Sequence, residues 1–440
     1  MPGSSRLLRL LPAAISLALV VTLGATSGST VPAPRRPPVD ASRFETRFPI
    51  KHVIFIIKEN RSFDQFFGLF PGANGATTGR TKEGVVPLVR GLPNQLPHDL
   101  THQYLTSLTS IDHGRMDGFG YNSYALRHAY TQAVPSDIPA YWHWAEQFVL
   151  GDYFFASAQG PSFPNHLYAI AAQSGGTHSN PGRDLSDPRA PKAGPLKTWG
   201  CDAPSWERLR AYDTEGNWVW VPPCFDFATE ADLLDKKGVP WAYYATPPYQ
   251  KGYIWSAFAA VQHIRESGEW QEHVRSVDWL TGDIRRGALP PVTWVTPRFA
   301  LSEHPEQGLC QGENWTVRVV NAVMRSEMWK DTAIFITWDD WGGFYDHEPP
   351  PQIDGFGLGI RVPLLLISPY ARRGYIDHRP AEFSSVLRFI EDNWGLTQLT
   401  HRDRRADDMS HDFSFESPPR PPDPLAPRKD CPPLTTPPDR

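Results

Sequence analysis

The chain has 440 residues and a formal net charge of -5, with 40% hydrophobic and 21% charged residues. This length is enough for one large α/β unit or for two or three domains. The slightly acidic balance implies no strongly basic face, which argues against nucleic acid as a partner.

The N-terminal stretch has the pattern of an export signal. Arg6 and Arg9 precede the apolar run LLPAAISLALVVTLGA, and the small residues ATS follow it. This order is typical of a secretory signal peptide, which we place at residues 1–29. A single membrane anchor is the alternative, but Pro12 interrupts the run, which is shorter than the ~20 residues of a membrane span. We therefore expect a secreted protein, in the medium or the outer cell envelope, with no stable membrane span.

Proline-rich segments flank the globular part of the chain. Residues 30–49 form a Pro-rich leader that we expect to be extended and mobile. Ten of the last 23 residues are proline, so we expect the tail at residues 401–440 to be polyproline-like or disordered. One folded domain is predicted between them, at residues 50–400.

An exported chain meets an oxidising compartment, so its four cysteines are expected to form two disulfides. Cys201 and Cys224 are the more local pair, and their spacing does not resemble a zinc site. A bond between Cys310 and Cys431 would attach the tail to the body. The sequence alone does not settle the connectivity.

Short apolar runs rich in β-branched residues alternate with helical patterns along the predicted domain. This alternation predicts an α/β fold with a mostly parallel sheet, whose strands are apolar throughout because helices cover both faces. Helices are clearest at Glu313–Met328 and Pro380–Trp394, and Gly395 supplies a stop for the second. The predicted strands are His52–Ile57, Trp241–Ala245, Val292–Thr296, Thr332–Thr337 and Val362–Ser368.

Oxygen-bearing side chains follow two of these strands directly. Glu59 and Asn60 come after the first strand, and Asp339 and Asp340 come after the fourth. Ligands bind beyond the carboxyl ends of the strands in open parallel sheets, so four hard ligands converge if these strands are neighbours. Such a cluster suits a divalent cation, with Ca²⁺, Mg²⁺ or Mn²⁺ favoured and Zn²⁺ an option if histidines join. The alternative for any single acid is a helix cap or an ion pair with Arg61.

Ser162 lies in a Gly-Pro-Ser-x-Pro turn just before a helical pattern. A hydroxyl at this position meets the free N–H groups of the helix, which also bind phosphoryl oxygens, so the turn suits attack on phosphorus. The alternative is that Ser162 only caps the helix, and the turn by itself favours the cap.

Four motifs, in this order, carry a resemblance to a known family: KHVIFIIKENRSFDQFFG, QGPSFPNHLY, SEHP and WDDWGGFYDHEPPP. Together they resemble the bacterial phosphoesterase family that contains phospholipases C and the respiratory-burst-inhibiting acid phosphatases, within the alkaline-phosphatase-like superfamily. The resemblance covers residues 50–399. It implies a three-layer α/β/α sandwich and metal-assisted phosphoryl transfer through a covalent phospho-enzyme.

The resemblance also implies roles for the residues after the strands. Glu59 with Asn60, and Asp339 with Asp340, match the two metal-ligand pairs of the family. Ser162 matches the nucleophile, which is itself a metal ligand, because a coordinated hydroxyl loses its proton more easily. This implication favours the nucleophile over the helix cap.

Two histidines match the family's motifs. His102 lies in a segment that lacks the family's usual proline, and His304 lies in the His-Pro motif. A lone histidine is more often structural, but in this context both are candidates for binding phosphate and protonating the leaving oxygen. Asp346 and His347, together with Arg61, are expected to orient the metal-binding loop from outside the ligand set.

Three departures from the family concern the substrate. Ser162 stands where phospholipase members often have Thr, His166 where many have Arg, and Trp341 where His is common. We therefore expect a secreted, metal-dependent phosphoric ester hydrolase of the phospholipase C type, whose substrate is a phosphate ester such as a phospholipid. An acid phosphatase is the alternative enzyme. A catalytically inactive, metal-stabilised binding protein is the alternative of another class. The oligomeric state is not indicated.

Overall fold

The computed structural model describes residues 36–213 and 215–434. The predicted signal peptide and the first residues of the predicted leader lie outside this part. Within it, the end of the leader contacts the folded domain, because Arg36 forms an ion pair with Asp283 at 3.0 Å. None of the helices in the described part is both long enough and apolar enough to cross a membrane.

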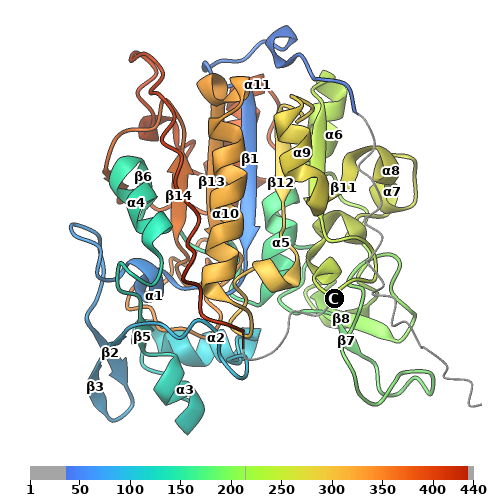
Figure 1. The fold of residues 1–440 in the computed structure, drawn as a ribbon. Helices are drawn as coiled ribbons and strands as arrows, with labels where there is room; N and C mark the ends of the chain where they lie inside the picture. Colours follow the sequence, from blue (N-terminus) through green and yellow to red (C-terminus); the bar gives the residue numbers. More distant parts are fainter. Residues whose placement is uncertain (1–35, 214, 435–440) are drawn as a thin grey trace, which may run out of the picture. The chain divides into compact units, whose positions relative to one another are not determined.

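A mixed β-sheet forms the core of the described residues (Figure 1). Its eight strands there are β1 (His52–Lys58), β6 (Val149–Gly151), β10 (Trp241–Ala245), β11 (Val274–Ser276), β12 (Val292–Val295), β13 (Thr332–Trp338), β14 (Leu364–Ile367) and β15 (Tyr375–Asp377). Their order across the sheet is β11-β10-β12-β1-β13-β14-β6-β15.

Every neighbouring pair in this sheet is parallel except the two pairs that include β14. All five predicted strands are present, so the prediction of a mostly parallel α/β sheet is confirmed. The direction of β14 was not predicted. The strands β6, β11 and β15 were missed because three residues are too few to show a periodicity.

Helices cover both faces of the sheet. Phe55 and Phe335 lie opposite each other on β1 and β13, and both rings pack against one helix, α11. Lys58 and Trp338 are likewise paired, but they point to the other face, toward α10 and α4. Side chains alternate between the two faces along a strand, so β1 and β13 contact helices on both faces of the sheet. The sheet is therefore the middle layer of three, as expected from the sequence. The helices are α4 (Pro139–Gln147), α10 (Leu309–Met324) and α11 (Phe383–Trp394).

The helix boundaries follow local chemistry. The α11 helix ends at Trp394, and Gly395 caps it with φ 63°, a conformation that glycine adopts without strain, as predicted. The α10 helix begins four residues before the predicted start and ends at Met324, after which a short 3₁₀ helix, η7 (Glu327–Asp331), leads into β13.

The adjacency of β1 and β13 determines where the site forms. The two strands are parallel, and their register pairs Lys58 with Trp338 at their carboxyl ends. The next residues, Glu59 and Asp339, therefore leave the sheet side by side. The two strands are thus neighbours, which is the condition stated above for Glu59, Asn60, Asp339 and Asp340 to lie close together.

The C-terminal segment is attached along α10. Residues 418–434 have no regular secondary structure, but Asn321 and Asn314 of α10 form hydrogen bonds with the backbone of Leu425 and Arg428. Figure 1 shows this red segment beside α10. These residues are therefore not disordered. Residues 401–417 of the predicted tail also differ from the expectation, because they contain helix α12 (His401–Arg405) and the 3₁₀ helix η8 (Ser410–Asp412). The division of the chain at residue 400 stays a prediction.

Two disulfides, both among the pairs considered above, are present. Cys201 pairs with Cys224, and Cys310, in the first turn of α10, pairs with Cys431 of the tail. The second bond fixes the C-terminal segment to α10.

The two disulfides are expected to contribute unequally to stability. They close loops of 121 and 23 residues, and the loss of loop-closure entropy grows with loop length. Replacing Cys310 and Cys431 by Ser should lower the free energy of unfolding by roughly 1.5 kcal/mol more than replacing Cys201 and Cys224. Denaturant unfolding of both double variants measures this difference, and an equal or reversed order would contradict it.

Candidate active site

The four oxygen-bearing residues after β1 and β13 form one buried cluster. The Asn60 N–H donates to Asp339 Oδ1 at 2.8 Å, and the Asp339 N–H donates to the carbonyl of Lys58 at 3.0 Å. Asn60 has φ 63°, a left-handed conformation that asparagine tolerates, and this turns the chain sharply after β1. Glu59, Asn60, Asp339 and Asp340 are each 0% exposed.

Several polar atoms of this cluster have no protein partner. Glu59 Oε2, Asn60 Oδ1 and Asp339 Oδ2 are buried, and no residue in the described part of the chain donates a hydrogen bond to them. Burial and the charge of Asp339 raise the pKa of Glu59 well above its ordinary value, and the same two causes raise the pKa of Asp340. Buried carboxylates without a counter-charge are costly. The cluster is therefore a place where a cation could bind.

His166 adds a nitrogen ligand to this cluster. Its Nε2 lies 3.0 Å from Glu59 Oε1 and 3.9 Å from Asp339 Oδ2, and these three side chains could hold a metal ion together. Burial lowers the pKa of His166 to about 4, which keeps the imidazole neutral, as metal binding requires. From the sequence, His166 was identified only as a departure from the family pattern. The sequence did contain a signal for its role: His166 lies four residues after Ser162, and residues at this spacing lie on the same face of a helix.

Ser162 lies beside the acids at the start of helix α5 (Ser162–Ala171). Its hydroxyl donates to Asp340 Oδ2 at 3.4 Å, and the other oxygen of Asp340 accepts the N–H of Gly342 at 2.7 Å. Pro161, not Ser162, occupies the N-cap position of α5, so the capping alternative is wrong. The turn thus brings a hydroxyl to the candidate metal cluster.

The two predicted histidines share a carboxylate. Asp99 Oδ2 lies 3.6 Å from His102 Nδ1 and 3.5 Å from His304 Nε2. His102 Nε2 lies 3.3 Å from the Asn60 amide nitrogen and 4.0 Å from Asp340 Oδ2, so it borders the acid cluster. Asp99 was missed in the sequence, although it belongs to the same motif segment as His102.

The charges around the two histidines move their pKa values in opposite directions. Burial lowers the pKa of His102, but the charges of Asp340 and Asp99 outweigh it and raise that pKa to about 9. Burial and the charge of His102 lower the pKa of His304 well below its ordinary value. One imidazole is therefore set to carry a proton and the other to stay neutral.

A buried ion pair fixes the turn that carries His304. Glu303 has φ 70°, and its carboxylate accepts hydrogen bonds from Tyr141 at 2.5 Å and from Trp338 at 3.0 Å. The ammonium group of Lys58 lies 3.1 Å from the same carboxylate, and both side chains are fully buried. Lys58 immediately precedes Glu59, so one interaction positions both sides of the site.

The structure does not bring the other three predicted residues into the acid cluster through their side chains. Asp346 accepts hydrogen bonds from Arg361 at 2.9 and 3.2 Å, and His347 contacts Asp64 at 2.7 Å, which makes a neighbouring buried network. The guanidinium of Arg61 donates to the carbonyl of Glu303 at 2.6 Å.

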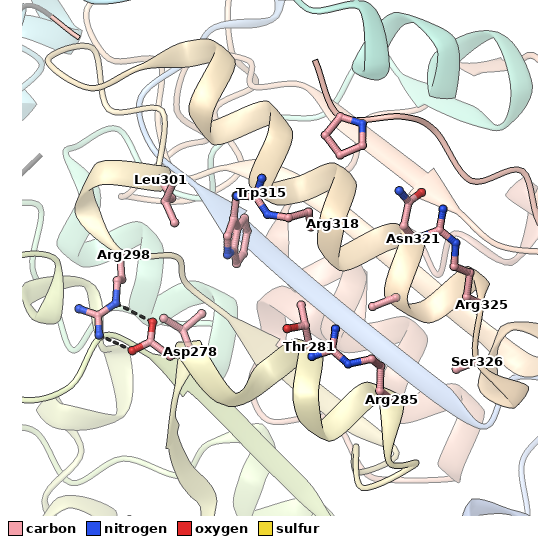
Figure 2. A pocket seen from close by; sticks show the side chains of 13 residues that line it. Asp278, Thr281, Arg285, Arg298, Leu301, Trp315, Arg318, Asn321, Arg325 and Ser326 are labelled. Atoms are coloured by element: carbon pink, nitrogen blue, oxygen red, sulfur yellow. Dashed lines mark hydrogen bonds and ion pairs between the residues drawn. The ribbon is translucent and has the colours of Figure 1, made fainter. Parts of the chain in front are cut away.

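A cavity of about 600 Å³ lies apart from this site, on the outer face of α10 (Figure 2). Arg318 and Arg325 line it from α10, and Arg298 lies at its edge, paired with Asp278. None of the residues lining this cavity belongs to the acid cluster. It is therefore not the space in which the site chemistry would occur.

The fold and the cluster define a class of protein: an α/β sandwich with buried oxygen-bearing side chains at the carboxyl ends of two central strands and a serine hydroxyl beside them. A family model described as "Phosphoesterase family" matches residues 50–397. The chain belongs to this family.

Curated relatives agree with this assignment. The chain is 26% identical to the hemolytic phospholipase C of Pseudomonas aeruginosa over 79% of this chain and 53% of that protein. It is also 26% identical to phospholipase C B of Mycobacterium tuberculosis, over 84% of this chain and 79% of that protein. Non-specific phospholipase C1 of Arabidopsis thaliana is 26% identical over 87% and 73% of the two chains.

The chain spans only 53% and 59% of the length of two of its curated relatives, the hemolytic enzyme of P. aeruginosa and a non-hemolytic phospholipase C of Burkholderia pseudomallei. Among solved structures, a Vibrio parahaemolyticus protein of the alkaline phosphatase superfamily matches 85% of this chain and 75% of its own. That match has 10% identity and a TM-score of 0.38, which is too weak to support an inference.

The acid cluster predicts a specific dependence of stability on pH. The folded-state pKa values of Glu59 and Asp340 lie above their ordinary values of 4.5 and 3.8, so the metal-free folded state holds more protons than the unfolded state. The contribution of these two acids to the free energy of unfolding should then fall as pH rises above about 5. A bound cation replaces these protons and removes the fall.

Thermal melting across this pH range, with and without chelator, measures the effect. Chelator should lower the melting temperature more at the higher pH. Glu59→Gln, which removes one of the acids, should reduce the pH dependence of the chelated protein. An identical pH dependence with and without chelator would contradict the assignment of the cluster.

Proposed function

We propose that the chain is a phosphoric ester hydrolase of the phospholipase C type, with Ser162 as its nucleophile. The observation that carries the proposal is the Ser162 hydroxyl, 3.4 Å from Asp340, beside three buried polar atoms without a partner in the described residues. Family membership and the printed names of the relatives, which are phospholipases C, support the reaction type.

The residues present fit a divalent cation. Glu59, Asn60, Asp339 and Asp340 supply oxygens, and His166 supplies a neutral nitrogen, so the set suits Mn²⁺ or Zn²⁺ as well as Mg²⁺ or Ca²⁺. When bound, such a cation lowers the pKa of a coordinated hydroxyl and offsets negative charge on the phosphoryl oxygens.

The protein side chains have separate tasks in the proposed reaction. Ser162 donates its hydroxyl proton to Asp340, and its Oγ forms a bond to phosphorus while the bond from phosphorus to the alcohol oxygen breaks. His102, which is protonated because its pKa is about 9, gives a proton to the leaving alcohol. Water then attacks the phospho-serine and gives a proton to His102, which the first step left neutral. The bond from phosphorus to Ser162 Oγ breaks, Asp340 returns its proton to that oxygen, and phosphate or its ester is released.

The remaining residues support the substrate. At the start of α5, the N–H of Phe163 donates to Asn180 Oδ1 at 2.8 Å and Pro164 has no N–H, so the backbone N–H of Ser162 itself is the remaining candidate in this turn for a phosphoryl oxygen. His304, kept neutral, is a hydrogen-bonding partner for the same group. We assign to Asp99 the role of positioning His102 and His304, because its carboxylate contacts both rings. We assign to Arg61 the support of the His304 turn, through its hydrogen bond to Glu303.

We also propose that the chain is exported, with its catalytic domain at residues 50–400. The N-terminal pattern of basic, apolar and small residues supports export. The two disulfides fit an oxidising compartment. The family match at residues 50–397 supports the domain limits.

The substrate class is tested by offering two chromogenic esters to the purified protein, each with and without chelator. Hydrolysis of p-nitrophenyl phosphorylcholine that chelator abolishes is the expected result. If only p-nitrophenyl phosphate were hydrolysed, the protein would instead be an acid phosphatase. Turnover of neither ester, with Ca²⁺, Mg²⁺, Mn²⁺ and Zn²⁺ each supplied, would favour a binding protein.

Substitution of the nucleophile should separate catalysis from folding. Ser162→Ala removes the attacking oxygen, so we expect kcat to fall by about three orders of magnitude or more, with an unchanged melting temperature. Ser162→Thr keeps a hydroxyl at the same position and is the matched control, in which measurable hydrolysis should remain. Full activity of the alanine variant would contradict the proposal.

The role of Asp99 predicts a shift in the pH profile. Its negative charge helps to raise the pKa of His102, so Asp99→Asn should lower that pKa. Because His102 acts in its protonated form, the alkaline limb of kcat/KM should then move to lower pH. A loss of activity that is equal at every pH would instead indicate only a structural role for Asp99.

A further inference from the structure

Three potential metal ligands meet at the edge of the sheet, outside the candidate active site. Asp377 is the last residue of β15, and His411 and Asp412 lie in the 3₁₀ helix η8 (Ser410–Asp412). His411 Nε2 lies 3.1 Å from Asp377 Oδ2 and 3.5 Å from Asp412 Oδ1. The three donor atoms all lie within 4.8 Å of one another.

The carboxylate of Asp412 is the observation that points to a ligand. The residue is 0% exposed, and neither of its oxygens accepts a hydrogen bond from any residue of 36–213 or 215–434. Burial and the charges of Asp377 and Asp407 raise its pKa well above the ordinary value. Arg372 and Arg379 contribute opposite charge at longer range, but neither forms an ion pair with Asp412 within those ranges. A buried carboxylate in this position lacks a close positive charge.

The orientation of His411 suits a metal ligand. Its Nδ1 lies 3.4 Å from Asp407 Oδ1, which itself accepts the N–H of Met409 at 2.7 Å. A metal-binding histidine typically donates its other ring N–H to a carboxylate, which fixes the tautomer. With the proton on Nδ1, the lone pair of Nε2 faces Asp377 and Asp412.

The spacing of the donors fits a tetrahedral zinc site. Zinc binds histidine nitrogen and carboxylate oxygen at about 2.0–2.2 Å in a tetrahedron, which places neighbouring ligands about 3.4 Å apart. The two separations from His411 Nε2, 3.1 and 3.5 Å, agree with this value. We propose that Asp377, His411 and Asp412 bind a zinc ion, with water as the fourth ligand.

A doubly protonated His411 would explain less. Such an imidazolium could donate to Asp377 from Nε2 and to Asp407 from Nδ1, at 3.1 and 3.4 Å. It would still leave both oxygens of Asp412 without a hydrogen bond from the described part of the chain. A metal ion satisfies Asp412 together with Asp377.

The proposed zinc site is separate from the candidate active site and has a structural role. The strand register runs from Asp377 through Gly151 and Leu364 to Thr337 of β13, which is three strand spacings or about 14 Å. The ion would join the segment after helix α12 (His401–Arg405) to the edge strand β15. The side chain of His411 is 15% exposed, which gives the ion access from solvent.

Zinc content in a background with a weakened catalytic cluster tests the site directly, because Asp339→Asn removes one of the carboxylates of that cluster. Asp339→Asn protein is stripped with chelator, equilibrated with Zn²⁺, desalted and analysed for metal. One zinc ion per chain is expected, and adding Asp412→Asn should remove it. The matched control is Asp408→Asn, because Asp408 instead accepts hydrogen bonds from Ser410, and an asparagine can keep them. Equal zinc with and without Asp412→Asn would overturn the proposal, as would loss of zinc in the control.

Thermal melting of otherwise unchanged protein gives an independent test that does not require the Asp339 variant. Chelator should lower the melting temperature more in the wild type than in Asp412→Asn or His411→Gln protein, because these variants retain only the metal at the active site. Ester hydrolysis by Asp412→Asn should equal that of the wild type. If chelator lowered the melting temperature of all three proteins equally, the proposed zinc site would be wrong, whatever the outcome of the hydrolysis assays.

Discussion

The site depends on one electrostatic constraint: three carboxylates and an amide are buried at the ends of two neighbouring strands, and the described residues neutralise them only in part, through His102 at 4.0 Å from Asp340. The parallel pairing of β1 and β13 places Glu59 against Asp339 and leaves oxygens of both without a partner in the described residues. Burying carboxylate oxygens without a partner is unfavourable unless a bound cation offsets their charge. In the proposed function, this deficit of positive charge is the source of metal affinity, and Ser162 lies at its border.

The ion pair between Lys58 and Glu303 keeps the nearest lysine charge away from the acid cluster. The positive charge of Lys58, one residue before Glu59, is directed away from the acids to Glu303 on the other side of the strand. The alternation of side chains along β1 thus puts a satisfied ion pair on one face and the unsatisfied cluster at the strand end. The same ion pair holds the turn before His304. A change at Lys58 would therefore disturb both the acids and the histidine.

The sequence could predict the parts of the site that depend on strand ends and motif order. The strands at His52 and Thr332 are long apolar runs, so the positions of Glu59 and Asp339 followed from the rule for parallel sheets. His166 and Asp99 were missed as site residues because their roles arise from packing between distant segments, as with Asp99 and His304. The antiparallel direction of β14 and the attachment of the proline-rich tail also depend on tertiary contacts, which local patterns do not encode.

The proposed cation lies among Glu59, Asn60, Asp339 and Asp340, with His166 and the Ser162 hydroxyl beside it. The most direct test is an anomalous difference map from a crystal of the active protein grown with Mn²⁺. An anomalous peak is expected at coordination distance from Glu59 Oε2, Asn60 Oδ1 and Asp339 Oδ2, the atoms that have no partner among the described residues. Ordinary water at these atoms in a protein that hydrolyses its ester with chelator present would contradict the account.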